Sequence, residues 1–409
     1  MSWIDGEAPT NGLLAFSAEE GGAQIIENGV RKPFEVDERQ KAQHKMTTQM
    51  EETELARLQD VASAYDPESL VPVPRHIIAF IQCSNRVSQQ FVNLPPYPHN
   101  EFANTDLQLT YANYYGIPPA LFDELIKDDL RTRGGARLGE HGDILQNNKH
   151  QTGGGWTKRH NTMQWTFGAL VQPRWHVQME PGHLFRSVYK MDKLPEEFLN
   201  NPRKMTPDML INFAVMAEVK CIGFSNSTYS KDVMLEPGGA VEKRAESIQP
   251  EYVRRARKID SAGHSGRNFT AEGKMGPYET QLESYGKIIP LVFGNFGEIN
   301  KACMAQLVQC AEQEGKARWR IMGACDEKEG IALVKNWFIR EIGVAAVRAQ
   351  AVLKRENLMR AIQQAESPFG WQHTYRMERD RSKRRSWNEQ YYETFCSFGP
   401  GEGESGIFA

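Results

Sequence analysis

The stretch that most constrains the fold is residues 206–224, where two apolar segments follow one another and carry charged residues at set positions. Asp208 begins the first segment, and Glu218 and Lys220 lie two residues apart within the second. Side chains two apart on a β-strand point to the same face of the sheet. Glu218 and Lys220 would therefore share one face, with Val219 turned into the core. If the two segments form a hairpin, Asp208 lies alongside them.

Two converging carboxylates and an ammonium group are the residue types that a metal-dependent phosphodiester hydrolase uses to hold its cation and orient a water. Carboxylate oxygens bind Mg²⁺ or Mn²⁺, and a bound cation activates water. We therefore predict Asp208 and Glu218 as metal ligands and, together with Lys220, as catalytic residues. Lys220 would orient or help to deprotonate the attacking water. Glu180, at the end of an earlier apolar run, is a candidate for an additional ligand.

Simpler roles remain open for the same residues. The spacer after Asp208 is short and lacks glycine, although Asn212 tolerates a tight turn. If the hairpin cannot close there, Glu180 becomes the more attractive ligand. Separately, the simpler reading of the two acids is that Asp208 ends a turn after Pro207 and Glu218 faces solvent from an edge strand. Lys220 at this spacing can also serve only as an ion-pair partner of Glu218.

The pair of motifs Pro207-Asp208 and Glu218-Val219-Lys220 resembles the signature of the PD-(D/E)XK nuclease superfamily. Pro207-Asp208 is the only Pro-Asp in the chain, and only this acid-x-Lys string lies in an apolar, strand-like run. The other such strings have Gly-rich or charged surroundings typical of loops: Glu272-Gly273-Lys274, Glu314-Gly315-Lys316 and Asp326-Glu327-Lys328. The resemblance implies a restriction-endonuclease-like fold and a Mg²⁺-dependent (or Mn²⁺-dependent) nuclease.

The elements predicted around the motif follow the order of that superfamily's core, which is helix, three strands, helix, strand. Apolar spacing predicts them at residues 160–170, 175–179, 208–213, 216–222, 239–260 and 287–293, the second helix being broken or bent near Pro250. We thus predict an α/β fold with this core at residues 156–315.

Additional α-rich regions are predicted on both sides of the core. Residues 1–74 read as a disordered and linker segment with one helix, and residues 75–155 as an α-rich region. Residues 316–365 read as a helical hairpin whose two helices are separated at Gly343, and residues 366–409 as a flexible tail, basic and then rich in Gly and Glu.

A second resemblance points to mobile genetic elements. The blocks at residues 239–245, 252–260 and 291–298 are similar to nuclease-like regions in reading frames of algal and dinoflagellate mobile elements. That similarity covers about residues 105–355. It implies a nuclease of a mobile element.

The charge distribution along the chain indicates which partners the protein can bind. The net charge of −3 does not itself indicate nucleic-acid binding, but basic residues cluster on the helix after the motif and near the C-terminus. We predict that the following basic residues contact phosphates of the substrate: Arg244, Arg255, Lys258, Arg384 and Arg385. We predict DNA rather than RNA as that substrate. A solvated basic face is the simpler explanation of each cluster. For Arg159 and His160, a phosphate contact and a structural role both stay open.

The remaining sequence features favour an intracellular protein, nuclear if eukaryotic. No apolar run is long enough to span a membrane, no secretory signal is visible, and the six cysteines lack paired metal-ligand spacing. The alternative to a nuclease is a non-catalytic nucleic-acid-binding or assembly protein of a mobile element or virus.

Overall fold

The structure is a computed structural model, and it divides into two compact units, Met1–Val73 and Pro74–Ala409. It describes residues 14–16, 23–27, 30–33, 49–50, 52–58, 60–61, 64, 73–92, 102–120, 122–127, 130–132, 136–146, 155–185, 188, 206–263, 269 and 272–365.

The first unit contains a small antiparallel sheet, formed by β1 (Leu14–Phe16), β2 (Ala23–Glu27) and β3 (Val30–Pro33). The sequence predicted a disordered and linker segment with one helix over residues 1–74, so these three strands correct that prediction. Glu27 pairs with Val30, and the two residues between them in sequence are Asn28-Gly29. Asn-Gly is the dipeptide most favoured in two-residue hairpins, because both positions require positive φ.

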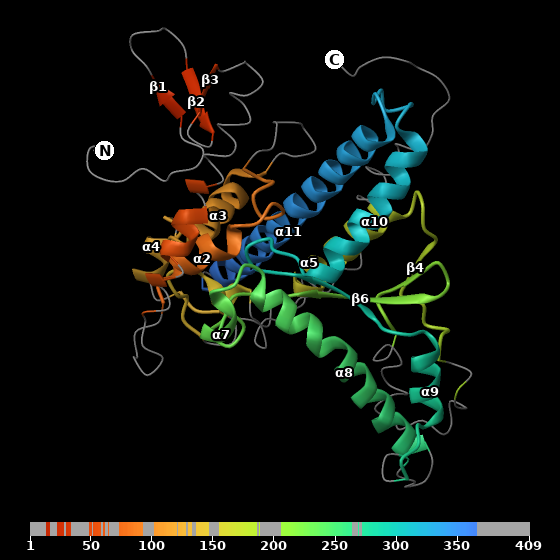
Figure 1. Cartoon of the computed structure of the whole chain (residues 1–409). Coiled ribbons are helices and arrows are strands. Elements are labelled where there is room, and N and C mark those ends of the chain that lie inside the picture. The colour runs from red at the N-terminus through yellow and green to blue at the C-terminus, as the bar shows by residue number, and fades with distance from the viewer. Residues whose placement is uncertain are drawn as a thin grey trace, which may run out of the picture. The chain divides into compact units, whose positions relative to one another are not determined.

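The second unit is built around a four-stranded sheet with strand order β4-β5-β6-β7, of which β4 and β6 are labelled in Figure 1. The strands are β4 (Val177–Met179), β5 (Met209–Ile211), β6 (Val215–Cys221) and β7 (Ile289–Phe293). Neighbours from β4 to β6 are antiparallel, whereas β6 and β7 are parallel. The strand β6 is central and Glu218 is buried, so the simpler alternative, in which Glu218 faces solvent from an edge strand, is wrong.

Helices cover both faces of this sheet. One face packs on α5 (Gly155–Val171), α10 (Lys301–Arg318) and α11 (Glu327–Ala365). The opposite face packs on α8 (Gly239–Gly263) and α9 (Pro277–Ser284), which lie below the sheet in Figure 1. The short helix α7 (Lys231–Met234) precedes α8. Apart from the additional helices α7 and α9, the order α5, β4, β5, β6, α8, β7 agrees with the predicted sequence of helix, three strands, helix and strand.

Helix α8 continues through Pro250 as one element, so the predicted break is absent. Proline removes one backbone donor and crowds the preceding turn. The apolar stripe of α8 packs on the sheet on both sides of Pro250, at Ile248 and Tyr252 among others, and this burial holds the helix together.

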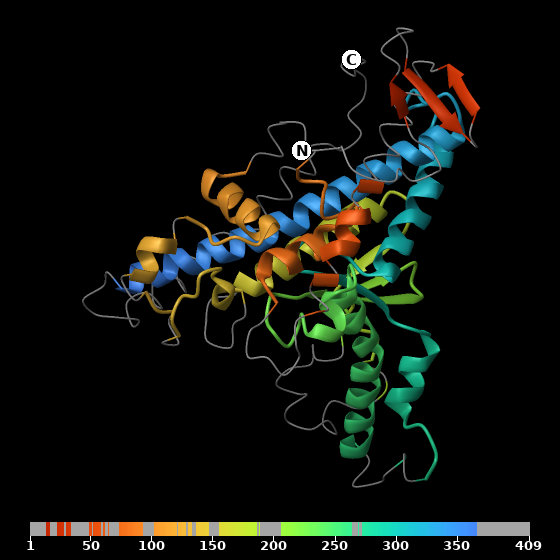
Figure 2. The ribbon, with the colours of Figure 1, turned by 60° about the vertical axis from the view of Figure 1, so that its left-hand side comes forward.

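The C-terminal helices correct the predicted domain boundaries. Helix α11 is continuous from Glu327 to Ala365, and Figure 2 shows it crossing the whole unit. Gly343 lies within it, where an added Cβ would stand 2.2 Å from the carbonyl oxygen of Val87. The glycine therefore permits a close backbone approach rather than a chain break. Helices α10 and α11 share one apolar core with the sheet, so the predicted appendage from residue 316 belongs to the core.

The region from 75 to 155 is α-rich, as predicted. Its helices are α2 (Arg75–Cys83), α3 (Asn104–Tyr115), α4 (Phe122–Lys127) and the 3₁₀ turn η2 (Asp143–Leu145). Leu109, Phe122 and Leu145 from these elements pack with Leu358 of α11 in one apolar cluster. The long helix α11 therefore joins this region to the helices that cover the sheet.

Candidate active site

The hairpin between β5 and β6 closes over a tight turn at Asn212 and Phe213. Both residues have positive φ, 51° and 61°, and the N–H of Ala214 donates to the carbonyl oxygen of Ile211 at 3.1 Å. The Asn212 side chain also accepts a hydrogen bond from the N–H of His176 at 2.9 Å. Asparagine visits this backbone region more readily than most residues, and its side chain stabilises the turn. The predicted hairpin therefore forms without glycine.

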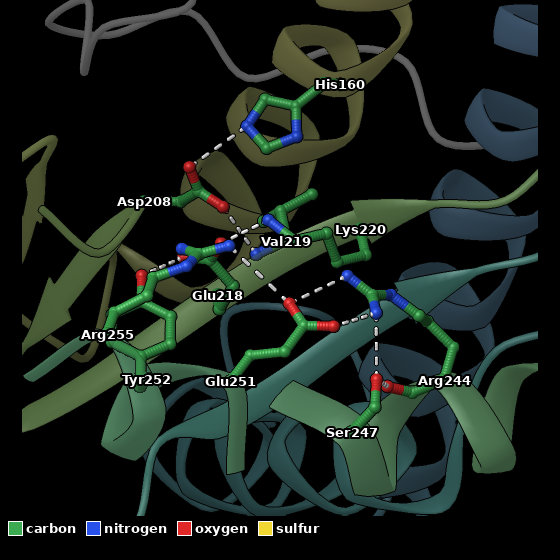
Figure 3. Close-up of polar contacts among 10 residues, drawn as sticks. All are labelled: His160, Asp208, Glu218, Val219, Lys220, Arg244, Ser247, Glu251, Tyr252 and Arg255. Carbon is green, nitrogen blue, oxygen red and sulfur yellow. Dashed lines mark hydrogen bonds and ion pairs between the residues drawn. The ribbon is translucent and has the colours of Figure 1, made fainter. Parts of the chain in front are cut away.

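The register of the hairpin brings Asp208 next to β6. Met209 pairs with Ala217, and the Asp208 carboxylate accepts the N–H of Val219 at 2.7 Å through Oδ2. Its other oxygen, Oδ1, lies 3.1 Å from Nε2 of His160 on α5 (Figure 3). Gln164, one helical turn further along α5, donates to the main-chain oxygen of Asp208 at 2.6 Å. Asp208 is thus held by both α5 and the central strand.

Glu218 and Lys220 share the face of β6 that is turned toward α8. Glu218 is 4% exposed, and Val219 between them is fully buried among the helices on the other face, as predicted. One carboxylate oxygen of Glu218 accepts from the Lys220 ammonium, and the other accepts from the hydroxyl of Tyr252 at 2.5 Å. The ion pair anticipated for Lys220 is therefore present.

The negative charges of Asp208 and Glu218 repel each other, and this repulsion affects the pKa of Glu218. Burial raises the pKa of the Glu218 carboxyl, and the negative charge of Asp208 raises it further, while Lys220 and Tyr252 oppose the rise. Like charges that cannot both be solvated favour the protonated form of one of them. A cation placed between Asp208 and Glu218 would relieve this repulsion.

Three neighbours of the acids lie outside the predicted set of site residues. Tyr252 of α8 is buried in the core, as expected for a packing residue, but its hydroxyl also orients Glu218. Burial, followed by the charge of Glu218, raises the pKa of Tyr252 well above its ordinary value, so the phenol remains a donor. His160 and Gln164 orient Asp208. Their i, i+4 spacing on α5, which puts them on one helix face, is the sequence signal that could have marked them as a pair.

The predicted phosphate-binding residues of α8 fall into two groups. Arg244 and Arg255 both pair with Glu251, and Arg244 also donates to Ser247 (Figure 3). Although burial pushes the pKa of Glu251 upward, Arg244, Arg255 and Lys220 together hold it below its ordinary value. Lys258 is exposed on the same helix. Arg384 and Arg385 lie outside the described residues.

Glu180 directly follows β4 and has a positive φ of 42°. Its N–H donates to the main-chain oxygen of Asp208 at 2.9 Å, which brings the two backbones together. Its own side chain is exposed. Among the residues that the structure describes, no group of three or more His, Cys, Asp or Glu side chains is arranged to hold a metal ion. Glu180 therefore does not complete a three-ligand cluster with Asp208 and Glu218.

Comparisons with protein-family models, with curated proteins and with solved structures find no match to this chain. Within the described part of the chain, no helix is both long and apolar enough to cross a membrane.

Proposed function

We propose that this protein is a metal-dependent nuclease that hydrolyses phosphodiester bonds in DNA. The observation that carries the proposal is the convergence of Asp208, which directly precedes β5, with Glu218 of the adjacent strand β6, and Lys220 lies on the same face as Glu218. The order of helices and strands supports a restriction-endonuclease-like core. The resemblance to mobile-element reading frames supports an intracellular role for the enzyme in such an element.

The donor set fits Mg²⁺ or Mn²⁺. These ions prefer oxygen ligands, and in phosphate-processing enzymes Mg²⁺ is often held by one or two carboxylates, with water and substrate phosphate filling the other positions. Asp208, directly before β5, and Glu218, within β6, supply two carboxylates, and the charge of Asp208 already raises the pKa of Glu218. When bound, the cation would polarise the phosphate and lower the pKa of a water.

Each residue of the site has a role that follows from its contacts. Glu218, held by Tyr252 on one oxygen, presents the other beside the Lys220 ammonium. Lys220 is partly exposed and is therefore placed to orient a water or to meet a phosphate oxygen. His160 and the N–H of Val219 fix the orientation of Asp208, so that little reorganisation is required on substrate binding.

Phosphate contacts next to this site come from α8. Lys258 lies exposed on that helix, and Arg244 and Arg255 both form ion pairs with Glu251. Backbone phosphates would supply most of the affinity for DNA, and this affinity would fall as salt rises.

One observation favours the alternative of a non-catalytic nucleic-acid-binding protein. All four carboxylate oxygens of Asp208 and Glu218 already have protein partners, namely His160, the N–H of Val219, Lys220 and Tyr252. A protein that kept the fold and lost the metal would show the same pairing.

A plasmid assay separates the two functions. Supercoiled DNA is incubated with the protein and Mg²⁺, with and without EDTA. The nuclease relaxes or linearises the plasmid only with Mg²⁺, and Asp208→Asn, Glu218→Gln and Lys220→Ala each lower the rate by about 100-fold or more. Lys274→Ala, in an exposed Glu-Gly-Lys string, is the matched control and retains activity. A wild-type protein that shifts the plasmid on a gel without cutting it supports the alternative.

A further inference from the structure

A cavity lies between α5 and α11, and neither Asp208 nor Glu218 is among its lining residues. Its volume is about 130 Å³, and its polar lining comes from Lys158, Arg159 and Thr162 of α5 and from Arg348 and Glu356 of α11. Bulk water occupies roughly 30 Å³ per molecule, so this space suits a group larger than a single water. Three cations and one carboxylate therefore line the same small cavity.

The buried charge of Arg159 has no carboxylate partner among the described residues. Its side chain is 8% exposed, and it donates to the side-chain oxygen of Gln350 at 2.8 Å and to the carbonyl oxygen of Cys221 at 3.0 Å. Both acceptors are neutral. Its Nε–H has no acceptor, and no Asp or Glu in the described part of the chain lies within ion-pair distance of the guanidinium. Buried charges in proteins are normally paired, because an uncompensated one is costly.

The carboxylate of Glu356 pairs with cations other than Arg159. Glu356 accepts two hydrogen bonds from the Lys158 ammonium, at 2.9 and 3.0 Å, and also meets Arg360 at 3.6 Å. Lys158 is 42% exposed, so this pair lies at the entrance. Arg348 lies over the ring of Phe102, with its guanidinium carbon 4.7 Å from the ring centre, and this stacking holds the side chain in place on α11.

We propose that this cavity binds a phosphate group, with Arg159 and Arg348 as the principal donors and Lys158 at the entrance. A phosphate supplies the counter-charge that Arg159 lacks and accepts hydrogen bonds from planar guanidinium groups. The positive end of the α5 dipole, which begins at Gly155 on the cavity wall, favours the same charge. The cavity shares no lining residue with the proposed metal site, and phosphate binding there does not depend on nuclease activity.

Binding is tested by titration calorimetry and thermal melts of the full chain, with inorganic phosphate as the first probe and chloride at equal ionic strength as the reference. Phosphate is expected to raise the melting temperature. Arg348→Gln is expected to weaken binding roughly tenfold, as for loss of one hydrogen bond to a charged group. Lys328→Gln, an equal charge change at an exposed position of α11, is the matched control.

A second variant tests the cavity without replacing an arginine. Val352 is a half-buried residue of the cavity wall, and Val352→Glu places a competing carboxylate there. Circular dichroism checks its fold, and loss of phosphate binding by the folded variant supports the site. A nucleoside 5′-monophosphate and an oligonucleotide with or without a 5′-phosphate then show which source the site prefers. Equal phosphate binding by wild type, Arg348→Gln and Val352→Glu, or no binding by wild type, overturns the proposal.

Discussion

Replacing Asp208 tests whether two acids of the sheet form a metal site or are merely neighbours. In the metal-free protein, the charge of Asp208 raises the pKa of Glu218, so the pair is under repulsion. A cation that binds the folded state alone stabilises it by about 2.7 kcal/mol when its concentration is 100 times Kd. At roughly 2 °C per kcal/mol for a domain of more than 200 residues, Mn²⁺ should raise the melting temperature of the wild type by about 5 °C.

The choice of substitution matters, because Asp208 also has a structural contact. Its Oδ2 accepts the N–H of Val219 at 2.7 Å. An asparagine at this position would retain an acceptor there and remove the charge, so the metal-free Asp208→Asn protein should be at least as stable as wild type. Asp208→Ala leaves the N–H without its partner, at a cost of about 1–3 kcal/mol. We therefore expect the alanine variant to melt about 2–6 °C below the asparagine variant.

The assay is a set of thermal melts in EDTA and in Mn²⁺. Asp326→Asn is the matched control, because Asp326 likewise accepts a backbone N–H, that of Glu329 at 2.7 Å, at the start of α11. The control should retain the full rise in melting temperature with Mn²⁺, whereas Asp208→Asn should lose most of it. An equal rise in wild type and Asp208→Asn would refute the assignment of Asp208 as a ligand.

Three further residues, Glu298, Gly343 and Asp260, allow predictions about stability and hydrogen exchange. Burial raises the pKa of Glu298 from 4.5 to about 7, so the folded protein binds this proton more tightly than the unfolded chain. The associated stability, roughly 3 kcal/mol, is present below about pH 4.5 and lost as pH rises through 7. Urea unfolding at pH 5 and pH 8 should show a smaller loss for Glu298→Gln, and an equal loss would contradict this. Gly343→Ala should cost about 1–3 kcal/mol in the same assay, because its Cβ would meet the oxygen of Val87, while Gly139→Ala has open space and should cost far less. Asp260 accepts two N–H groups at the start of α9, at 2.8 and 3.0 Å. Asp260→Ala should speed hydrogen exchange in α9, and unchanged exchange there would count against this cap.

The elements around the candidate site followed from local patterns in the sequence. The period of two in Glu218-Val219-Lys220 predicted which side chains share a face, and the apolar runs predicted the four strands and the two helices in order. These features depend on neighbours a few residues apart, which a sequence displays directly.

Features that depend on distant contacts were not visible in this way. Gly343 reads as a helix break, but the backbone of Val87, far away in sequence, requires a residue without a side chain there. Arg244 and Arg255 read as free basic residues, but the folded helix places Glu251 between them. Tertiary packing decides such cases, and it overrides local propensity.

The central claim is that Asp208 and Glu218 hold one divalent cation, and its most direct test is anomalous diffraction from crystals soaked in Mn²⁺. We predict a peak about 2.0–2.3 Å from a carboxylate oxygen of each residue, with the Lys220 ammonium displaced from Glu218. The peak should vanish in Asp208→Asn crystals treated identically. A wild-type map with no peak between the two carboxylates, at Mn²⁺ concentrations that saturate any effect on melting temperature, would contradict the account.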